Sequence, residues 1–197
     1  MTRICVFAGS SAGNRPAYRS AAEDLGRTLA ARGIAVVYGG GRIGLMGALA
    51  DAALASGGEV IGVIPAALVA KEVAHGALTE LRVVPSMHER KALMADLSDG
   101  VIALPGGWGT LDELFEILTW GQLGLHAKPC GLLNVDGYFD PLLSFVDHAI
   151  DEGFVRREHR EMIAVSTSAG DLIGLLESYR PPAVEKWPDP SSPQDRR

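Results

Sequence analysis

The residues best suited to chemistry follow a short apolar run at 101–104, in the segment Pro105-Gly106-Gly107-Trp108-Gly109-Thr110-Leu111-Asp112-Glu113. Three glycines in four positions let the backbone approach a ligand closely. The carboxylate of Glu113, in the first turn of a predicted helix and beside a cradle of phosphate size, could act as a general base or stabilise a cationic transition state. Thr110 and Glu113 also match a capping box, so the alternative is that Glu113 only satisfies the start of its own helix.

A second candidate is the arginine in Ser86-Met87-His88-Glu89-Arg90-Lys91, at the start of a helix predicted over 87–98. An arginine in a first helical turn opposes the helix dipole, and a bound phosphate would explain the exception. Arg90 is therefore predicted to hold a phosphate or to orient Glu113. The alternative is an ordinary charged residue on the surface of this helix.

A further glycine-rich segment, Gly39-Gly40-Gly41-Arg42-Ile43-Gly44-Leu45-Met46-Gly47, satisfies G-x-G-x-x-G and opens a predicted helix. A dinucleotide site would need an acid at the end of the next strand, but the nearest one, Glu59, precedes that strand. A dehydrogenase is therefore disfavoured. Two interpretations stay open for this segment: a phosphate or nucleotide monophosphate site, and a tight turn between strand and helix.

Elements of two kinds must position these groups. Short apolar runs alternate with segments of helical period, which predicts an α/β, Rossmann-like, doubly wound and mostly parallel sheet with helices on both faces. Such sheets bind ligands beyond the carboxyl ends of their strands. One domain is predicted over 1–180, followed by a loose proline-rich tail at 181–197. The predicted strands are 3–8, 34–38, 60–64, 101–104, 130–135 and 162–165, and the predicted helices are 16–32, 43–56, 87–98, 111–124, 138–152 and 169–179.

Charge and composition limit the partners. The net charge is −6 and no basic cluster exceeds Arg156-Arg157, so we expect neither nucleic acid nor a membrane surface as partner. The first ten residues hold too few apolar side chains for a secretory signal, and no later stretch suits a membrane span. Cys5 and Cys130 lie in apolar runs, which predicts buried reduced thiols and a cytoplasmic location. The histidines share no spacing suited to a metal, and we expect no metal and no cofactor.

The segments 86–91 and 105–113 resemble the LONELY GUY (LOG) family, whose signature is PGGxGTxxE. The resemblance extends over most of residues 3–155, through 5–10, 38–47, 119–124 and 131–138. It implies a Rossmann-like homodimer that hydrolyses cytokinin riboside 5′-monophosphates to free cytokinin base and ribose 5-phosphate. It also implies activity on AMP.

The same resemblance assigns the site. Arg90 and Glu113 would be catalytic, and Trp108 would change the shape of the loop because the family usually has tyrosine or phenylalanine there. Amides of the glycine-rich loop would hold the phosphate without a metal. The residues implied to bind substrate are Ser10, Gly40, Gly41, Glu72, Met87, Arg90, Lys91, Gly106, Gly107, Trp108, Gly109, Thr110, Leu111, Asp112, Glu113 and Thr119.

Other functions are weighed against this one. A nucleotide-binding protein without hydrolytic activity and an AMP-specific nucleosidase are the alternatives, since similar glycine loops occur in carriers and sensors. Family members are often labelled lysine decarboxylases, a reaction that needs a lysine-specific site. None of the four lysines, Lys71, Lys91, Lys128 and Lys186, stands in a recognisable Schiff-base context.

Overall fold

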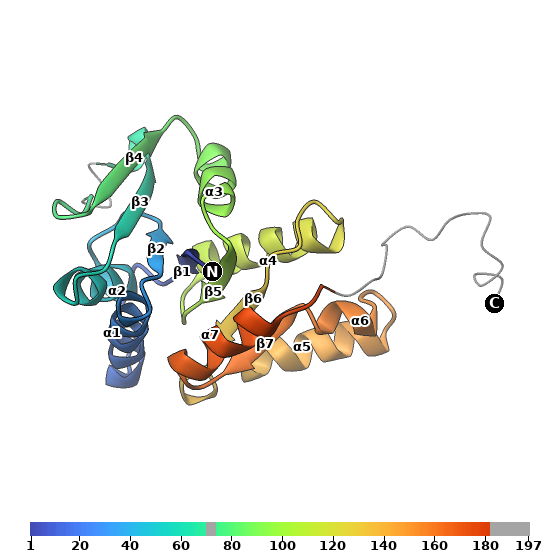
Figure 1. The fold of residues 1–197 in the computed structure, drawn as a ribbon. Helices are drawn as coiled ribbons and strands as arrows, with labels where there is room; N and C mark the ends of the chain where they lie inside the picture. The colour runs from blue at the N-terminus through green and yellow to red at the C-terminus, as the bar shows by residue number, and fades with distance from the viewer. Residues whose placement is uncertain (70–73, 182–197) are drawn as a thin grey trace.

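Seven parallel strands form one sheet in the computed structural model, which describes residues 1–69 and 74–181. Their order across the sheet is β4-β3-β2-β1-β5-β6-β7 (Figure 1). The predicted α/β, doubly wound fold is confirmed. The strands are β1 (Arg3–Phe7), β2 (Ala35–Tyr38), β3 (Val60–Pro65), β4 (Glu80–Val84), β5 (Gly100–Ala103), β6 (Cys130–Leu133) and β7 (Ile163–Ser166).

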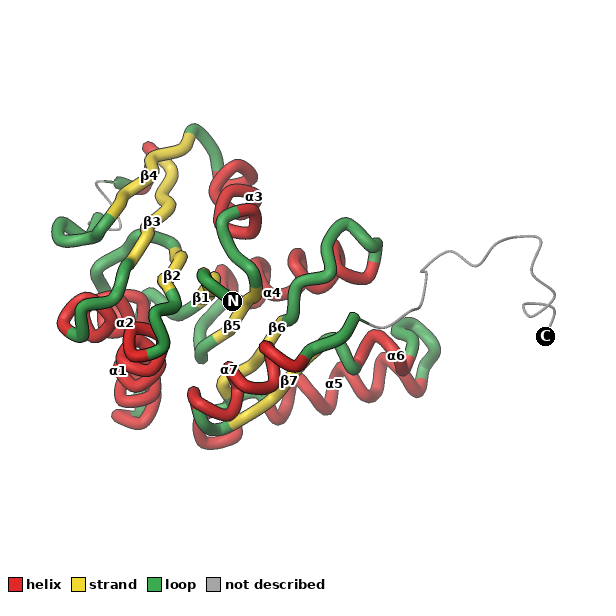
Figure 2. The backbone as a smooth tube through the Cα atoms, in the orientation of Figure 1, coloured by secondary structure: helices red, strands yellow, loops and turns green. Residues whose placement is uncertain are grey.

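Helices cover both faces of this sheet, and Figure 2 shows the strands running between them. Helices α1, α2 and α7 pack with one face, and α3, α4 and α5 with the other. The helices are α1 (Pro16–Ala31), α2 (Gly44–Ala55), α3 (Met87–Asp96), α4 (Trp108–Gln122), α5 (Asp140–Asp151), α6 (Arg157–Arg160) and α7 (Ala169–Ser178), with 3-10 turns η1 (Ala66–Leu68) and η2 (Val135–Gly137).

The central strands are apolar throughout because both of their faces are covered. In β1, Ile4 and Val6 enter the core beneath α1 and α2, while Cys5 and Phe7 enter the core beneath α3 and α4. Successive side chains of a strand point to opposite faces, so a continuous apolar run supplies both cores. These buried runs are the strands that the sequence predicted.

Strand β4 was not predicted. It lies at the edge of the sheet, paired only to β3 among the described strands, and most of Glu80–Val84 is exposed or half-buried. An edge strand with one charged face lacks the apolar run that identifies a central strand. The short helix α6 was also missed, and α4 begins at Trp108 rather than at the predicted 111.

The chain changes direction across the sheet between β1 and β5, which are hydrogen-bonded neighbours. At their carboxyl ends the Gly9 amide donates to the Pro105 carbonyl at 3.1 Å, so the loops after both strands are joined. Such a switch point opens a crevice between successive loops. The fold thereby brings the segment 105–113 beside the end of β1. The predicted proline-rich tail falls almost entirely on residues 182–197, outside the described residues.

Candidate functional site

A cavity of about 230 Å³ lies beyond the carboxyl ends of β1, β2 and β5. Its walls come from the loops after these strands and from the first turns of α3 and α4. The structure thus brings together residues far apart in the sequence at the place where α/β sheets bind ligands. The predicted site residues that line it are Ser10, Met87, Arg90, Gly107, Trp108, Gly109, Thr110, Asp112 and Glu113.

Glu113 is half-buried and contributes to the wall of the cavity. The capping-box interpretation is wrong, because α4 begins after Gly107 and no side chain caps it. Thr110 is the third residue of the helix and is buried. A Cβ built on Gly106 would lie 2.1 Å from the Oγ1 of Thr110, so the hydroxyl is packed against Gly106. Glu113 therefore lies in the second turn of α4 rather than the first, and its place in the cavity wall is not explained by capping of the helix.

A capping pair does occur at the start of α3. The Ser86 hydroxyl oxygen accepts from the Glu89 amide at 3.2 Å, and the hydroxyl donates to the Glu89 carboxylate at 2.9 Å. This S-x-x-E pair was not singled out from the sequence, although its spacing is that of a capping box. It anchors the turn that carries Met87 and Arg90 into the cavity.

Arg90 is buried, with 5% of its surface exposed, so the alternative of a surface residue is wrong. Its Nη2 donates to the Gly39 carbonyl at 2.9 Å, which ties α3 to the end of β2. A Cβ at position 39 would lie 1.9 Å from Nη2. Glycine at position 39 thus makes room for the guanidinium, and the buried cation faces a cavity that can take an anion.

Charge in the cavity also reaches the strand beneath it. Burial raises the pKa of the Cys5 thiol well above its usual value, and the negative charge of Glu113 raises it further while Arg90 opposes the rise. Both ionic side chains therefore act on the same atom of β1. Opposite charges near one another in a partly buried cavity suit a reaction that creates charge.

The helix start of α4 is the part of the cavity that can receive an anion. The first amides of a helix have no acceptor within it and carry partial positive charge. A Cβ at Gly107 or at Gly109 would meet no atom within 4 Å, so this turn is open to a ligand. Gly107, Gly109 and Thr110 line the cavity, which gives a phosphate direct access to their backbone.

The glycine-rich segment 39–47 has a different role. The amides of Leu45 and Met46, at the start of α2, both donate to the Gly9 carbonyl, at 3.0 and 3.4 Å. The helix start that could have held a phosphate is therefore occupied by the chain itself. Gly44 has φ +64° and lies so near the loop after β1 that a Cβ would be 2.3 Å from the Ser10 carbonyl carbon. This geometry favours the tight-turn interpretation of the segment.

Several predicted binding residues are placed away from this cavity. Lys91 pairs with Asp112 and Glu116, each at 3.0 Å; burial opposes its charged form, but these two partners raise the pKa of Lys91 above its ordinary value. The Gly40 carbonyl accepts from His75, and Gly41 pairs with Ala74. The Thr119 hydroxyl donates to the Phe115 carbonyl, and Gly106 lines a neighbouring cavity. Leu111 lines neither this cavity nor the neighbouring one, and Glu72 lies outside the described residues.

Five cavity residues were not among those implied to bind substrate: Gly39 and Met46, which the sequence analysis named only as part of the segment 39–47, and Val6, Ala8 and Gly9. Gly9 and Gly39 each follow a buried strand, and this signal could have identified them. Their roles depend on contacts with loops distant in sequence, which no local pattern contains.

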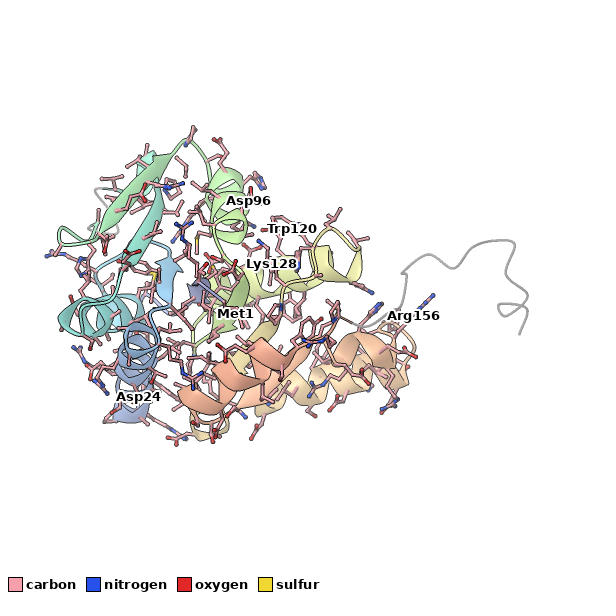
Figure 3. The ribbon with its side chains drawn as sticks, in the orientation of Figure 1. Met1, Asp24, Asp96, Trp120, Lys128 and Arg156 are labelled. Carbon is pink, nitrogen blue, oxygen red and sulfur yellow. The ribbon has the colours of Figure 1, made fainter. Side chains whose placement is uncertain are left out.

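Among the described residues, neither a lysine nor a cluster of metal-binding side chains lines the cavity. Within residues 1–69 and 74–181 no three histidine, cysteine or acidic side chains are grouped to hold a metal. The two described lysines point elsewhere: Lys91 bridges α3 and α4, and Lys128, labelled in Figure 3, donates to the Ala95 carbonyl in α3.

No helix in the described part of the chain is long and apolar enough to cross a membrane.

A parallel α/β sheet with an acid, a buried arginine and an open helix start at its switch point defines a Rossmann-like protein whose crevice could receive an anion. The family model described as "possible lysine decarboxylase" matches residues 46–176. A cytokinin riboside 5′-monophosphate phosphoribohydrolase of Arabidopsis thaliana is 53% identical over 179 residues, covering 91% of this chain and 84% of the relative. Another, from Oryza sativa subsp. japonica, is 52% identical over 91% of this chain and 74% of its own length. The chain belongs to this family, the LOG family.

Solved structures share the fold at lower identity. A molybdenum cofactor binding protein from the phototrophic bacterium Rippkaea orientalis is 26% identical, with a TM-score of 0.67 over 90% of this chain and 96% of that one. The molybdenum cofactor carrier protein of Chlamydomonas reinhardtii is 22% identical, with a TM-score of 0.68 over 89% of this chain and 96% of that one. The same architecture therefore occurs in proteins named as carriers as well as in proteins named as hydrolases.

Proposed function

We propose that this protein hydrolyses the N-glycosidic bond of cytokinin riboside 5′-monophosphates, which are N6-substituted AMP, releasing cytokinin base and ribose 5-phosphate. Relatives with more than half of their aligned residues identical carry the name of this activity. The observation that carries the proposal is the meeting of Glu113, Arg90 and the open start of α4 in one cavity. These are the groups that a phosphorylated ribosyl substrate requires.

Glu113 would act on the ribose. Cleavage of the bond between C1′ and the base develops positive charge on the sugar and negative charge on the departing base. A carboxylate near the ribose stabilises the first charge and can place the attacking water. The water oxygen bonds to C1′ as the C–N bond breaks, and a water proton ends on the base, so base and ribose 5-phosphate leave as complete products.

The 5′-phosphate would lie at the start of α4. Amides of Gly107, Gly109 and Thr110 can donate to its oxygens, and the positive end of the helix favours its charge. Arg90 supplies the cation, held in place by its bond to the Gly39 carbonyl. Local donors of this kind are needed because the chain as a whole is acidic, with a net charge of −6.

The finer assignments belong to the same proposal. We expect AMP to be a substrate too, because phosphate and ribose contacts do not depend on the N6 substituent. A homodimer is supported by apolar side chains exposed on and after α4, among them Phe115, Leu123 and Leu125, and sedimentation equilibrium measures it. A cytoplasmic location is supported by two buried, unoxidised cysteines, Cys5 and Cys130, and fractionation of cells tests it.

A second candidate is a nucleotide-binding protein without turnover, because a protein named for binding the molybdenum cofactor shares this fold at 26% identity. A nucleotide that stays intact on the protein through a long incubation would support this candidate. An AMP-specific nucleosidase is the third. The products formed from N6-isopentenyladenosine 5′-monophosphate and from AMP distinguish these three candidate functions.

The experiment is chromatographic release of base from N6-isopentenyladenosine 5′-monophosphate and, separately, from AMP. We expect Glu113→Gln to lower the rate by about 10²–10³, the usual cost of losing one transition-state interaction. Glu116→Gln is the matched control, because Glu116 lies on the same helix, pairs with Lys91 and is not part of the cavity wall. A Glu113→Gln variant with normal activity would remove Glu113 from the mechanism, and release from AMP alone would favour the nucleosidase.

A further inference from the structure

Tyr138 contacts the glycine-rich loop at 105–109 but does not line the cavity that holds Glu113 and Arg90. Its hydroxyl donates to the Gly106 carbonyl at 2.5 Å. Tyr138 and Gly106 line a second cavity of about 310 Å³, which shares Gly9, Ser10 and Gly107 with the first. The peptide between Gly106 and Gly107 therefore lies between the two cavities.

The tyrosine is held by a well-packed turn. η2 follows β6, and within it Asp136 and Gly137 adopt positive φ of 50° and 71°. The buried side chain of Asn134 accepts from the Phe139 amide at 2.8 Å and donates to Asp140 at 2.7 Å. The phenol ring packs edge-on against Tyr18, with ring centres 5.6 Å apart. The hydroxyl thus reaches the loop from a fixed position.

The opposite side of the peptide is constrained by covalent geometry. No peptide bond in the described chain is cis, and in a planar trans peptide the carbonyl and the next N–H point in opposite directions. Since the Gly106 carbonyl points to Tyr138, the Gly107 N–H points away from it, and Gly107 itself lines the cavity that holds Glu113 and Arg90. Gly107 is also the residue that precedes α4.

We propose that Tyr138 is a positioning residue: its hydroxyl orients the Gly106–Gly107 peptide so that the Gly107 N–H donates to the 5′-phosphate. The inference rests on the proposed function for the identity of the anion. Glycine-rich loops have many accessible backbone conformations, and a single bond from a rigid neighbour selects among them. The packed rings of Tyr18 and Tyr138 would then fix the position of the loop at 105–109 as well as contribute to the core.

The test is Tyr138→Phe, which removes the donor and keeps the ring. We expect the Kd for ribose 5-phosphate and the KM for AMP to rise about three- to tenfold, the loss of one neutral hydrogen bond. The Kd for free adenine should stay unchanged, and the thermal midpoint should fall by only about 2–4 °C, the cost of one lost hydrogen bond in a protein of this length. Tyr18→Phe is the matched control, because Tyr18 belongs to the same ring pair and gives the glycine loop no hydrogen bond in the described chain.

Calorimetric titration of ribose 5-phosphate and adenine separates this inference from the proposed function, since binding is measured without turnover. A selective loss of ribose 5-phosphate affinity in Tyr138→Phe supports the positioning role even if no base is released. Unchanged ribose 5-phosphate affinity overturns it. Equal losses for ribose 5-phosphate and adenine, or an equal effect in Tyr18→Phe, also overturn it, because they indicate general loosening of the site.

Discussion

Replacing Gly39 by alanine tests how the buried arginine is positioned. Gly39 does not adopt a positive φ, so alanine is compatible with its backbone. Its new methyl group would lie 1.9 Å from Nη2 of Arg90, whereas such atoms normally stay about 3.5 Å apart. The guanidinium must therefore move by roughly 1.5 Å, which breaks its 2.9 Å bond to the Gly39 carbonyl.

The substitution should lower both stability and activity. The clashing group is the far end of a flexible side chain, so overpacking should cost about 1–3 kcal/mol. For a protein of this length each kcal/mol lowers Tm by about 2–4 °C. A misplacement of about 1 Å at a reacting centre can lower the rate about 10²-fold, equal to about 2.7 kcal/mol. We expect kcat/KM for the nucleotide to fall by about that factor.

Base release and thermal unfolding of Gly39→Ala are the two assays. Gly174→Ala is the matched control: a Cβ there meets nothing within 4 Å, and alanine should stabilise α7 by up to about 1 kcal/mol without changing activity. A double-mutant cycle with Arg90→Met identifies the route of the effect. If Gly39→Ala acts by displacing the guanidinium, it should lower kcat/KM little further in a protein that already carries Arg90→Met.

Two results would refute this reasoning. Normal kcat/KM in Gly39→Ala would mean that the guanidinium can move without consequence, so Arg90 would not set the geometry of the site. Full additivity with Arg90→Met would mean that the new methyl group acts on another part of the cavity, such as Met46, whose Sδ lies 3.3 Å from the built Cβ.

Two further predictions concern titratable side chains in the sheet and next to it. The pKa of Asp99 is lowered chiefly because its carboxylate accepts a hydrogen bond from the Thr2 amide at 2.6 Å. The contribution of Asp99 to folding stability is therefore present above the pKa of about 3.9 that Asp has in the unfolded chain, and it is lost as the pH falls below that value. Urea unfolding between about pH 5 and 2 should therefore depend less on pH in Asp99→Asn than in Asp24→Asn, and equal slopes would contradict this. Burial raises the pKa of Cys130 to about 12 and that of Cys5 well above its usual value. Neither thiol should therefore react with a disulfide reagent before the protein unfolds. Rapid labelling of the native protein would contradict this, because it would show that one of the two thiols is accessible.

Local patterns in the sequence were sufficient for the fold class. Five central strands were predicted because both faces are buried and the runs are continuously apolar, as in Val101–Ala103. β4 was missed because an edge strand such as Glu80–Val84 is mostly exposed. The start of α4 was predicted three residues late, because its cap is the backbone of Gly107 and no side chain marks it.

The candidate site was predicted only in part for a similar reason. Glu113 and Arg90 were identified from residue type and from the loop beside them. The resemblance implied that Lys91 and Thr119 bind substrate, but neither lines the cavity. Lys91 reaches α4 from α3, a contact that depends on how the helices are packed, whereas the Thr119 hydroxyl donates to the Phe115 carbonyl within α4. Gly39 and Tyr138 were missed as site residues because their partners, Arg90 and Gly106, lie more than thirty positions away.

The sequence by itself determined the alternation of strands and helices, the composition of both glycine-rich segments and the identity of the acid and the arginine. These are local properties of residue type and spacing. Only the tertiary structure decided which glycine-rich segment can receive an anion. The start of α2 is closed by the Gly9 carbonyl, whereas the start of α4 opens into the cavity, because β1 lies between β2 and β5 in the sheet. Strand order is a property of the whole packed chain, and no single segment specifies it.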